Sequence, residues 1–285
     1  MALVLADVGG TNVRFAFVSH GQADPQGTRR YQNDEYALFD DALDAYVADT
    51  GLAGIRSLSV AVAGPVTDQT ARLTNRNWHL DAADLAQKYH CESVYLLNDL
   101  SALGYALDFL HEEDLTPIIQ TAPGSGADQR LVIGVGTGFN VSPVLKVGGG
   151  SVCLRAEAGL GSLPTRVAGL MQDYLQRPAP WVRCAEDAVR GPGLTELHAA
   201  ATGGQKLDAR DVLSAAEKGD AQALASVTVY ARMIGEFAQD LRLLYMPRGG
   251  IFFAGSVMRG LLDSPVRDIF IETLNAQPTV KTKLS

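Results

Sequence analysis

The chain has 285 residues, 47% of them hydrophobic and 20% charged, so it can bury a substantial core and is not a disordered protein. Its net charge of −8 disfavours general nucleic-acid binding, and its three widely spaced cysteines disfavour both a disulfide framework and a structural zinc site. No apolar run approaches the roughly 18–20 residues of a membrane helix, so we expect a cytoplasmic α/β protein.

The first part of the chain alternates between strand-like and helix-like patterns. The opening apolar run carries no positive charge before it and leads straight into Asp7, which predicts a buried strand rather than a signal peptide. Apolar runs predict strands over residues 3–8, 13–18, 55–63 and 93–97. Apolar residues at helical spacing predict helices over 36–49, 81–89 and 100–110, with Asp81 as the N-cap of the second.

A second block of the chain begins near residue 116, inside a boundary region over 111–128 that contains Pro117 and the stretch from Pro123 to Gly126. This stretch predicts two domains, 1–110 and 111–285. The second domain is expected to have fewer strands and more helix than the first. Its predicted strands are 131–135, 141–147, 151–155 and 251–254, and its predicted helices are 166–176, 184–190, 192–201, 208–217 and 220–245.

The first strand ends in Asp7 and a paired-glycine turn that leads directly into another strand. This context differs from the P-loop and the Rossmann turn, which both lead from a strand into a helix. Paired glycines let backbone N–H groups approach a phosphate, and a neighbouring carboxylate suits hydrated Mg²⁺. The candidate nucleotide-binding residues are therefore Asp7, Gly9, Gly10, Thr11 and Asn12, and an ordinary hairpin turn is the alternative.

A second glycine loop, formed by Gly136, Thr137 and Gly138, also joins two predicted strands. Two such loops about 125 residues apart, one opening each block, suggest a phosphate held between two similar domains. A third break, at Gly255, follows the last predicted strand and begins a helix, where small residues allow a base or a sugar to lie against the backbone.

Polar residues at the end of another strand are candidates for the chemical step. Asn98 and Asp99 follow the apolar run 94–97, where the carboxylate could accept a proton from a hydroxyl group. The alternative is that Asp99 caps the helix that begins near residue 100. Glu157 and Glu186 could bind further hydroxyl groups of a polyol, although each considered alone is typical of a solvated charge at a helix end.

Taken in order, these segments resemble the bacterial glucokinase family. The resemblance rests on residues 7–14, 97–99, 134–138 and 190–194, and it extends to Thr74, Asn75 and Trp78 and to the stretch 249–255. It covers roughly residues 2–262. It implies the hexokinase/actin/chaperone-ATPase fold, an α/β fold with two domains of related, ribonuclease H-like core and an active cleft between them.

The resemblance also implies an activity and a set of roles. The activity would be an ATP-dependent hexose kinase, converting ATP and D-glucose to ADP and glucose 6-phosphate, with Mg²⁺ bound through water at Asp7. ATP would be bound by Asp7, Gly9, Gly10, Thr11, Asn12, Gly136, Thr137, Gly138 and Gly255, and the sugar by Asn75, Asn98, Asp99, Glu157 and Glu186. Asp99 would be the catalytic base toward the C6 hydroxyl. The implied partner is a hexose, with neither nucleic acid nor membrane, and a homodimer is the expected assembly.

The chain departs from the family pattern at several positions. The histidine that binds a sugar hydroxyl in the family is Leu160 here, and an unpaired hydroxyl facing it would cost about 1–3 kcal/mol. The Leu-Gly pair after the second loop is Phe139-Asn140, and the second glycine of the last loop is Ser256. Two alternatives therefore stand beside a glucokinase: a kinase of a different sugar, and a non-catalytic sugar or nucleotide sensor. The presence of Asp99 favours an enzyme.

Overall fold

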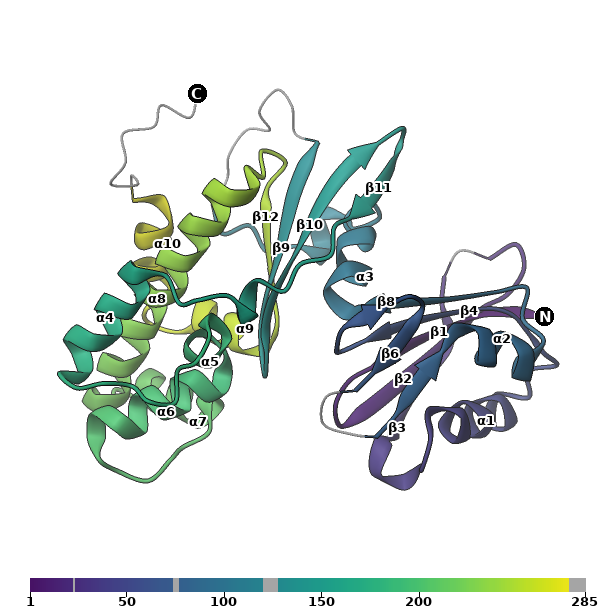
Figure 1. Cartoon of the computed structure of the whole chain (residues 1–285), viewed down its shortest axis with the longest axis horizontal. Coiled ribbons are helices and arrows are strands. Elements are labelled where there is room, and N and C mark those ends of the chain that lie inside the picture. The colour runs from purple at the N-terminus through teal and green to yellow at the C-terminus, as the bar shows by residue number, and fades with distance from the viewer. Residues whose placement is uncertain (23, 74–76, 120–127, 277–285) are drawn as a thin grey trace. The chain divides into compact units, whose positions relative to one another are not determined.

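The computed structural model describes residues 1–22, 24–73, 77–119 and 128–276, and the chain divides into two compact units, Met1–Leu103 and Gly104–Ser285. Each unit contains a sheet with helices packed on it (Figure 1). Within the described ranges, no helix combines the length and the apolar character needed to cross a membrane.

The first unit is built on a five-stranded sheet with the order β3-β2-β1-β4-β8. β1 pairs antiparallel with β2 and parallel with β4, and β8 continues the parallel part. A small antiparallel sheet of β5, β6 and β7 follows β4 in the chain. The elements are β1 (Ala2–Val8), β2 (Asn12–Val18), β3 (Gln26–Gln32), α1 (Phe39–Thr50), β4 (Ile55–Val62), β5 (Val66–Thr67), β6 (Thr70–Arg72), β7 (His79–Asp81), α2 (Ala82–Tyr89) and β8 (Ser93–Asn98).

Aromatic side chains fill the core between this sheet and α1. Phe15 of β2 stacks on Tyr46 of α1 with ring centroids 5.1 Å apart, and Phe39 meets Trp78 edge-on at 6.2 Å. Trp78 is only 1% exposed, so the tryptophan that contributes to the family resemblance is a core residue. Such aromatic pairs stabilise a core beyond the area that they bury.

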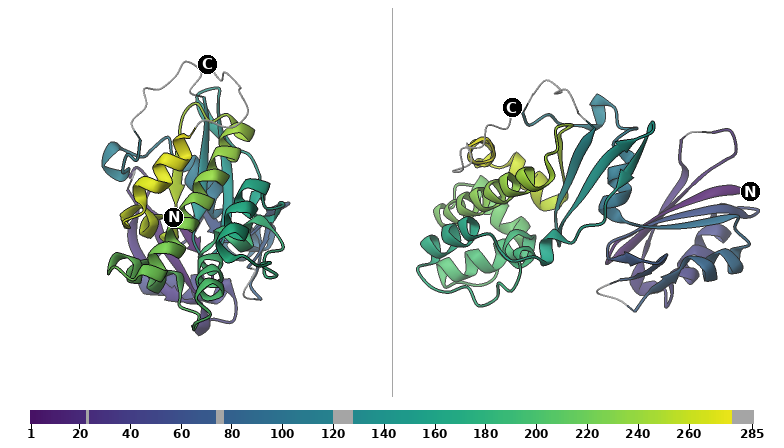
Figure 2. Two further views of the ribbon diagram at one scale, coloured as in Figure 1. Left: turned by 90° about the vertical axis from the view of Figure 1, so that its left-hand side faces the viewer. Right: turned by 45° about the horizontal axis from the view of Figure 1, so that its top comes forward.

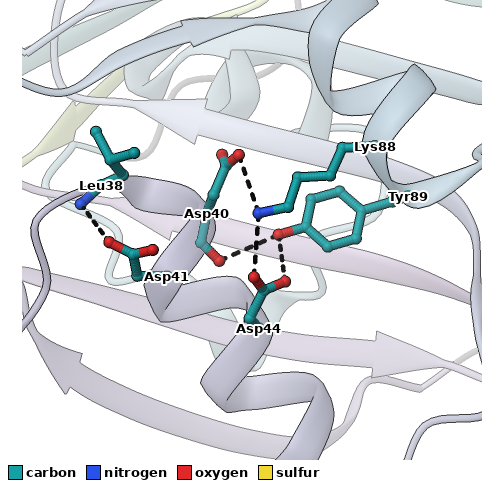
Figure 3. Close-up of polar contacts among 6 residues, drawn as sticks. All are labelled: Leu38, Asp40, Asp41, Asp44, Lys88 and Tyr89. Atoms are coloured by element: carbon teal, nitrogen blue, oxygen red, sulfur yellow. Dashed lines mark hydrogen bonds and ion pairs between the residues drawn. The ribbon is translucent and has the colours of Figure 1, made fainter.

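A polar cluster joins α1 to α2 on the outside of the first unit (Figure 3). The Lys88 ammonium lies 3.2 Å from a carboxylate oxygen of Asp40 and 3.0 Å from one of Asp44. The Tyr89 hydroxyl donates to Oδ1 of Asp44 at 2.7 Å and to the backbone carbonyl of Asp40 at 3.1 Å. Burial and the hydrogen bond to Asp44 raise the pKa of Tyr89, so the hydroxyl stays a donor at all physiological pH values.

The second unit contains a four-stranded sheet with the order β11-β10-β9-β12, in which β12 is parallel to β9. Most of its helices gather on one side of this sheet (Figure 2). The long helix α8 packs against α4, α7 and α10, and Phe237 of α8 stacks on Phe139 of β10 at 5.0 Å. The elements are β9 (Gln129–Val135), β10 (Phe139–Val147), β11 (Gly150–Cys153), α4 (Thr165–Leu175), α5 (Ala185–Val189), α6 (Gly191–Thr202), α7 (Ala209–Glu217), α8 (Ala221–Tyr245), β12 (Ile251–Ala254), α9 (Ser256–Asp263) and α10 (Arg267–Asn275).

The division between the units falls inside α3 (Asp99–Ala106), at 103/104, whereas the sequence pattern placed a boundary after residue 110. Close packing explains why Gly104 belongs to the second unit. A Cβ added there would lie 2.7 Å from the sulfur of Cys153 and 2.9 Å from Val144. Asp108, just after the helix, forms an ion pair with the buried Arg130 of β9 at 2.9 Å.

Candidate active site

The carboxyl ends of three parallel strands of the first unit meet at one edge of its sheet. The pairing aligns Val8 of β1 with Val62 of β4, and Val62 with Asn98 of β8. Asp7 and Asp99 each stand next to one of these aligned residues. Loops at the carboxyl ends of parallel strands are the usual place for a ligand in α/β folds.

The first glycine turn is held by a residue that the sequence analysis did not identify, Asn33. The turn closes with the Gly9 N–H donating to the Asn12 carbonyl at 2.9 Å. Asn33 is fully buried, and its side-chain amide donates to the Gly9 carbonyl at 2.8 Å. Its backbone N–H donates to the Thr11 carbonyl at 2.9 Å. The hydrogen bonds from Asn33 to two carbonyl groups therefore fix the conformation of the turn. Backbone N–H groups held in one conformation can bind an anion.

The N-cap of α3 is Asn98. Its Oδ1 accepts hydrogen bonds from the N–H groups of Leu100 at 3.1 Å and Ser101 at 3.3 Å, and its Nδ2 donates to the Gly64 carbonyl at 3.1 Å. The Asp99 carboxylate accepts from the N–H of the neighbouring Leu100 at 2.9 Å. The capping role considered for Asp99 is thus performed by Asn98, which makes Asp99 available for chemistry.

Asp99 has an altered acidity. Burial by the surrounding protein raises the pKa of its carboxyl, the Leu100 hydrogen bond lowers it in part, and the nearby negative charge of Asp7 raises it further. One side of the residue remains exposed to solvent, so the environment is crowded but accessible. A crowded carboxylate that a second carboxylate makes more basic is a reasonable proton acceptor.

The residues at this edge suit a hydrated Mg²⁺. No group of three or more His, Cys, Asp or Glu side chains is close enough to hold a metal within the described ranges. Mg²⁺ that accompanies a nucleotide needs no such cage, because waters and phosphates supply most of its oxygen ligands. The exposed carboxylate of Asp7, beside the glycine turn, is the donor that fits this arrangement, and a cation there would relieve its repulsion with Asp99.

In the second unit, the glycine loop after β9 lies beside the first residues of two helices. The Gly136 N–H donates to the Gly138 carbonyl at 2.9 Å, and the Gly191 N–H, at the start of α6, donates to the Gly136 carbonyl at 2.8 Å. A Cβ on Gly136 would lie 4.0 Å from the N atom of Ser256, the first residue of α9. Helix N-termini carry partial positive charge, so the loop lies where a phosphate is favoured.

A pocket of about 590 Å³ opens beside this loop, entirely within the second unit. Its walls are Gly136 and Thr137, the beginning of α6, the side of α7, and the beginning of α9. Asp208 and Arg210 contribute charged groups, and Leu213 contributes an apolar surface. The volume falls within the range of small-molecule sites.

Gly255 packs against the residue that precedes the loop 136–138. It has φ +101°, a value that other residues rarely adopt, and a Cβ there would lie 2.2 Å from the carbonyl oxygen of Val135. β12 runs parallel to β9 with Ala254 opposite Gly134, so Gly255 and Gly136 follow these strands at the same edge. The glycine is therefore required for the close approach of two backbones.

The two predicted sugar-binding glutamates of this unit lie on either side of one short turn. Asn140 of β10 donates to the Glu157 carboxylate at 2.9 Å. Glu186 lies near Gly159, where a Cβ would be 3.3 Å from its Oε2, and near Gly138, where a Cβ would be 3.5 Å from its Oε1. The structure thus brings Gly138, Glu157 and Glu186 together.

Glu186 is also paired with a cation. Its Oε1 lies 3.3 Å from a guanidinium nitrogen of Arg190, which also binds Asp187 at 3.0 Å. Burial raises the pKa of Glu186 and Arg190 opposes this change, while Asp187 adds to it. The carboxylate is thus held in one place by Arg190.

Two residues named in the sequence analysis remain to be placed. Leu160, at the end of the turn, is 65% exposed, so its apolar side chain is not part of the core. Asn75 lies outside the described residues.

Comparison with known proteins gives one consistent result. The sequence model of the glucokinase family matches residues 4–285. A glucokinase of Nitrobacter hamburgensis is 33% identical over 282 residues, covering 94% of this chain and 86% of that protein. The crystal structure of a glucokinase from an Antarctic psychrotroph superposes with a TM-score of 0.78 at 25% identity, over 95% of this chain and 90% of the other. A ROK family glucokinase from Streptomyces griseus, solved with glucose and AMPPNP, has a TM-score of 0.63 at 21% identity over 98% and 92%.

Proposed function

Because the chain belongs to the glucokinase family, and is therefore an ATP-dependent sugar kinase with the actin-like ATPase fold, we propose that it transfers the γ-phosphoryl group of ATP to the C6 hydroxyl of glucose. The observation that carries the proposal is the Asp99 carboxylate, which lies at the sheet edge with Asp7 while Asn98 caps the helix. Mg²⁺, cytoplasmic location and a homodimer remain predictions.

In the proposed reaction, Asp99 accepts the proton of the C6 hydroxyl while the oxygen of that hydroxyl attacks the γ-phosphorus of ATP. The bond from that phosphorus to the bridging oxygen breaks, and ADP leaves. Phosphoryl transfer requires mainly alignment of the reactants and neutralisation of charge. Hydrogen-bond donors that are held in place therefore contribute most of the rate acceleration. Mg²⁺ would supply charge neutralisation on the phosphates, with Asp7 holding one of its waters.

Each unit contributes groups of its own to this reaction. The first unit contributes the turn 9–12, whose backbone N–H groups Asn33 keeps oriented, together with the base. The second contributes the loop 136–138, beside the starts of α6 and α9, and the pocket next to it for the nucleoside. Glu157 and Glu186 accept hydrogen bonds from sugar hydroxyls, and the neutralising Arg190 keeps Glu186 in position.

A coupled assay of ADP release over a panel of hexoses tests the proposed function. We expect turnover with glucose that requires both ATP and Mg²⁺. Turnover with another hexose and not with glucose would favour a kinase of a different sugar. The absence of turnover with every sugar, in a folded protein that binds ATP, would favour a sensor.

The exposed Leu160 gives a specific reason to examine the sugar, since leucine can neither donate nor accept a hydrogen bond. If a glucose hydroxyl faces it, the loss of about 1–3 kcal/mol weakens the affinity by roughly 5- to 150-fold. We therefore expect the Leu160→His variant to increase kcat/KM for glucose within that range.

The matched control is Leu244→His, which changes an exposed leucine of α8 outside the candidate site. It should leave kcat/KM unchanged. Equal effects of the two variants would mean that Leu160 does not face the sugar. No gain from Leu160→His in a folded protein would mean either this or that the hydroxyl of the nearby Ser162 already replaces the histidine.

A further inference from the structure

The side-chain amide of Asn140 contacts three consecutive residues of the turn that carries Glu157. Its Nδ2 donates to the Ala156 carbonyl at 2.8 Å and to Oε2 of Glu157 at 2.9 Å. Its Oδ1 accepts from the Ala158 N–H at 3.1 Å. One amide therefore binds the backbone on both sides of Glu157 and also the carboxylate itself.

Asn140 lies close in the chain to the glycine loop 136–138. It is the second residue of β10, which begins directly after the glycine loop 136–138. The turn also packs closely on the start of this strand, because a Cβ on Gly159 would lie 2.3 Å from the Phe139 carbonyl oxygen. The strand that leaves the phosphate loop thus determines where the Glu157 turn lies.

The chemistry of the side chain is specific. An amide can donate and accept at the same time, and the three contacts use both abilities. Aspartate has the same shape but has no N–H to donate, and it would place a second negative charge beside Glu157. Alanine would remove all three contacts, including the hydrogen bond to the Glu157 carboxylate.

We propose that Asn140 is a positioning residue that orients the Glu157 carboxylate toward a sugar hydroxyl, and so sets the affinity for the sugar. This inference rests on the proposed function. Asn140 acts through Glu157, to which its amide donates at 2.9 Å.

The test is a double-mutant cycle read as Michaelis constants for sugar and for ATP. Asn140→Ala should raise the KM for glucose about tenfold, as expected for the loss of one hydrogen bond to a charged group, and change the KM for ATP less than about twofold. Asn140→Asp should raise the KM for glucose further. In a Glu157→Ala background, Asn140→Ala should change the KM for glucose less than about twofold, because the carboxylate through which it acts has been removed.

Gln129→Ala is the matched control, since this amide on the neighbouring strand β9 donates to the Tyr245 carbonyl away from the glutamates. It should leave both Michaelis constants unchanged. Independent, additive effects of Asn140→Ala and Glu157→Ala would overturn the proposal, as would equal rises in the two Michaelis constants for Asn140→Ala.

Two further measurements keep the outcomes distinct. If Asn140→Ala does not fold, Asn140→Asp keeps the shape of the side chain without its N–H groups, and a KM for glucose equal to that of the unmodified protein would overturn the proposal. An unmodified protein that turns over no sugar contradicts the proposed function. In that case calorimetric titration of the same variants with glucose reports the role of Asn140, and unchanged binding in Asn140→Ala would overturn it.

Discussion

Replacing Asp99 with alanine is expected to lower kcat for the best sugar by about 10²–10⁴-fold, the usual contribution of a general base. The loss of stability should be small, because the cap of α3 comes from Asn98 through the Leu100 and Ser101 N–H groups. The Kd for ATP, measured by calorimetry, should change little, since the pocket beside the second glycine loop contains no part of Asp99.

Asp81 provides the matched comparison within the same unit. It also stands between a strand and a helix, and its side chain accepts from the Ala83 and Asp84 N–H groups at 2.8 and 3.2 Å. Asp81→Ala should cost about 1 kcal/mol in the free energy of unfolding, the usual effect of removing an N-cap, with an unchanged kcat. If Asp99→Ala behaves in the same way, Asp99 is a structural residue and the assigned base is wrong.

The pH dependence of kcat/KM gives a second test of Asp99. The base must be ionised to accept a proton, so activity falls as the pH falls through its pKa. Burial and the charge of Asp7 raise that pKa above the ordinary value of 3.8, so the fall should begin at a higher pH than for an ordinary aspartate. The residual activity of Asp99→Asn should lack this acid limb, and the same limb in both proteins would assign it to another group.

Introducing alanine at Gly255 is expected to have the largest effect on stability. The added Cβ would lie 2.2 Å from the Val135 carbonyl oxygen, a backbone atom that cannot move without moving the loop 136–138. The strained φ costs about 1–3 kcal/mol, and overpacking costs a similar amount. We therefore expect the free energy of unfolding in urea to fall by about 2–6 kcal/mol, together with a higher KM for ATP.

Gly203→Ala tests a positive φ without a close contact. Gly203 also has a positive φ, +65°, but a Cβ there would meet nothing within 4 Å. This variant should lose only about 1–2 kcal/mol, the cost of the left-handed conformation, and keep the KM for ATP of the unmodified protein. Equal losses in the two variants would mean that contact with Val135 contributes nothing.

The sequence predicts the apolar elements of this fold well and the polar ones poorly. The parallel strands β1, β4 and β8 and the long helix α8 appear at the predicted places, because burial gives them continuous or periodic apolar residues. β3 was missed because almost all of its residues are exposed at the sheet edge, as the order of strands explains. β5, β6 and β7 are too short for a pattern, and α10 was also not predicted.

The candidate site shows the same limit at the level of single residues. The glycine loops and the polar residues that follow strands are visible in sequence, because their spacing and their place after an apolar run reflect local chain geometry. The side chain of Asn33 donates a hydrogen bond to Gly9, 24 residues away in the chain. The side chain of Asn140 donates to Ala156, 16 residues away. Amides of this kind have the same sequence appearance as those in surface turns, so tertiary structure alone reveals them.

The walls of the 590 Å³ pocket all come from the second unit, from segments spread between residues 136 and 260. If this pocket binds the nucleoside as proposed, preference for one nucleoside triphosphate over another is encoded between residues 136 and 260 and not in the strand that ends in Asn98 and Asp99. Recombination that exchanges this stretch between relatives would then transfer nucleotide preference as a block and leave the proposed base in its native surroundings. On the proposed function, the choice of phosphoryl donor and the chemical step would therefore be able to change separately.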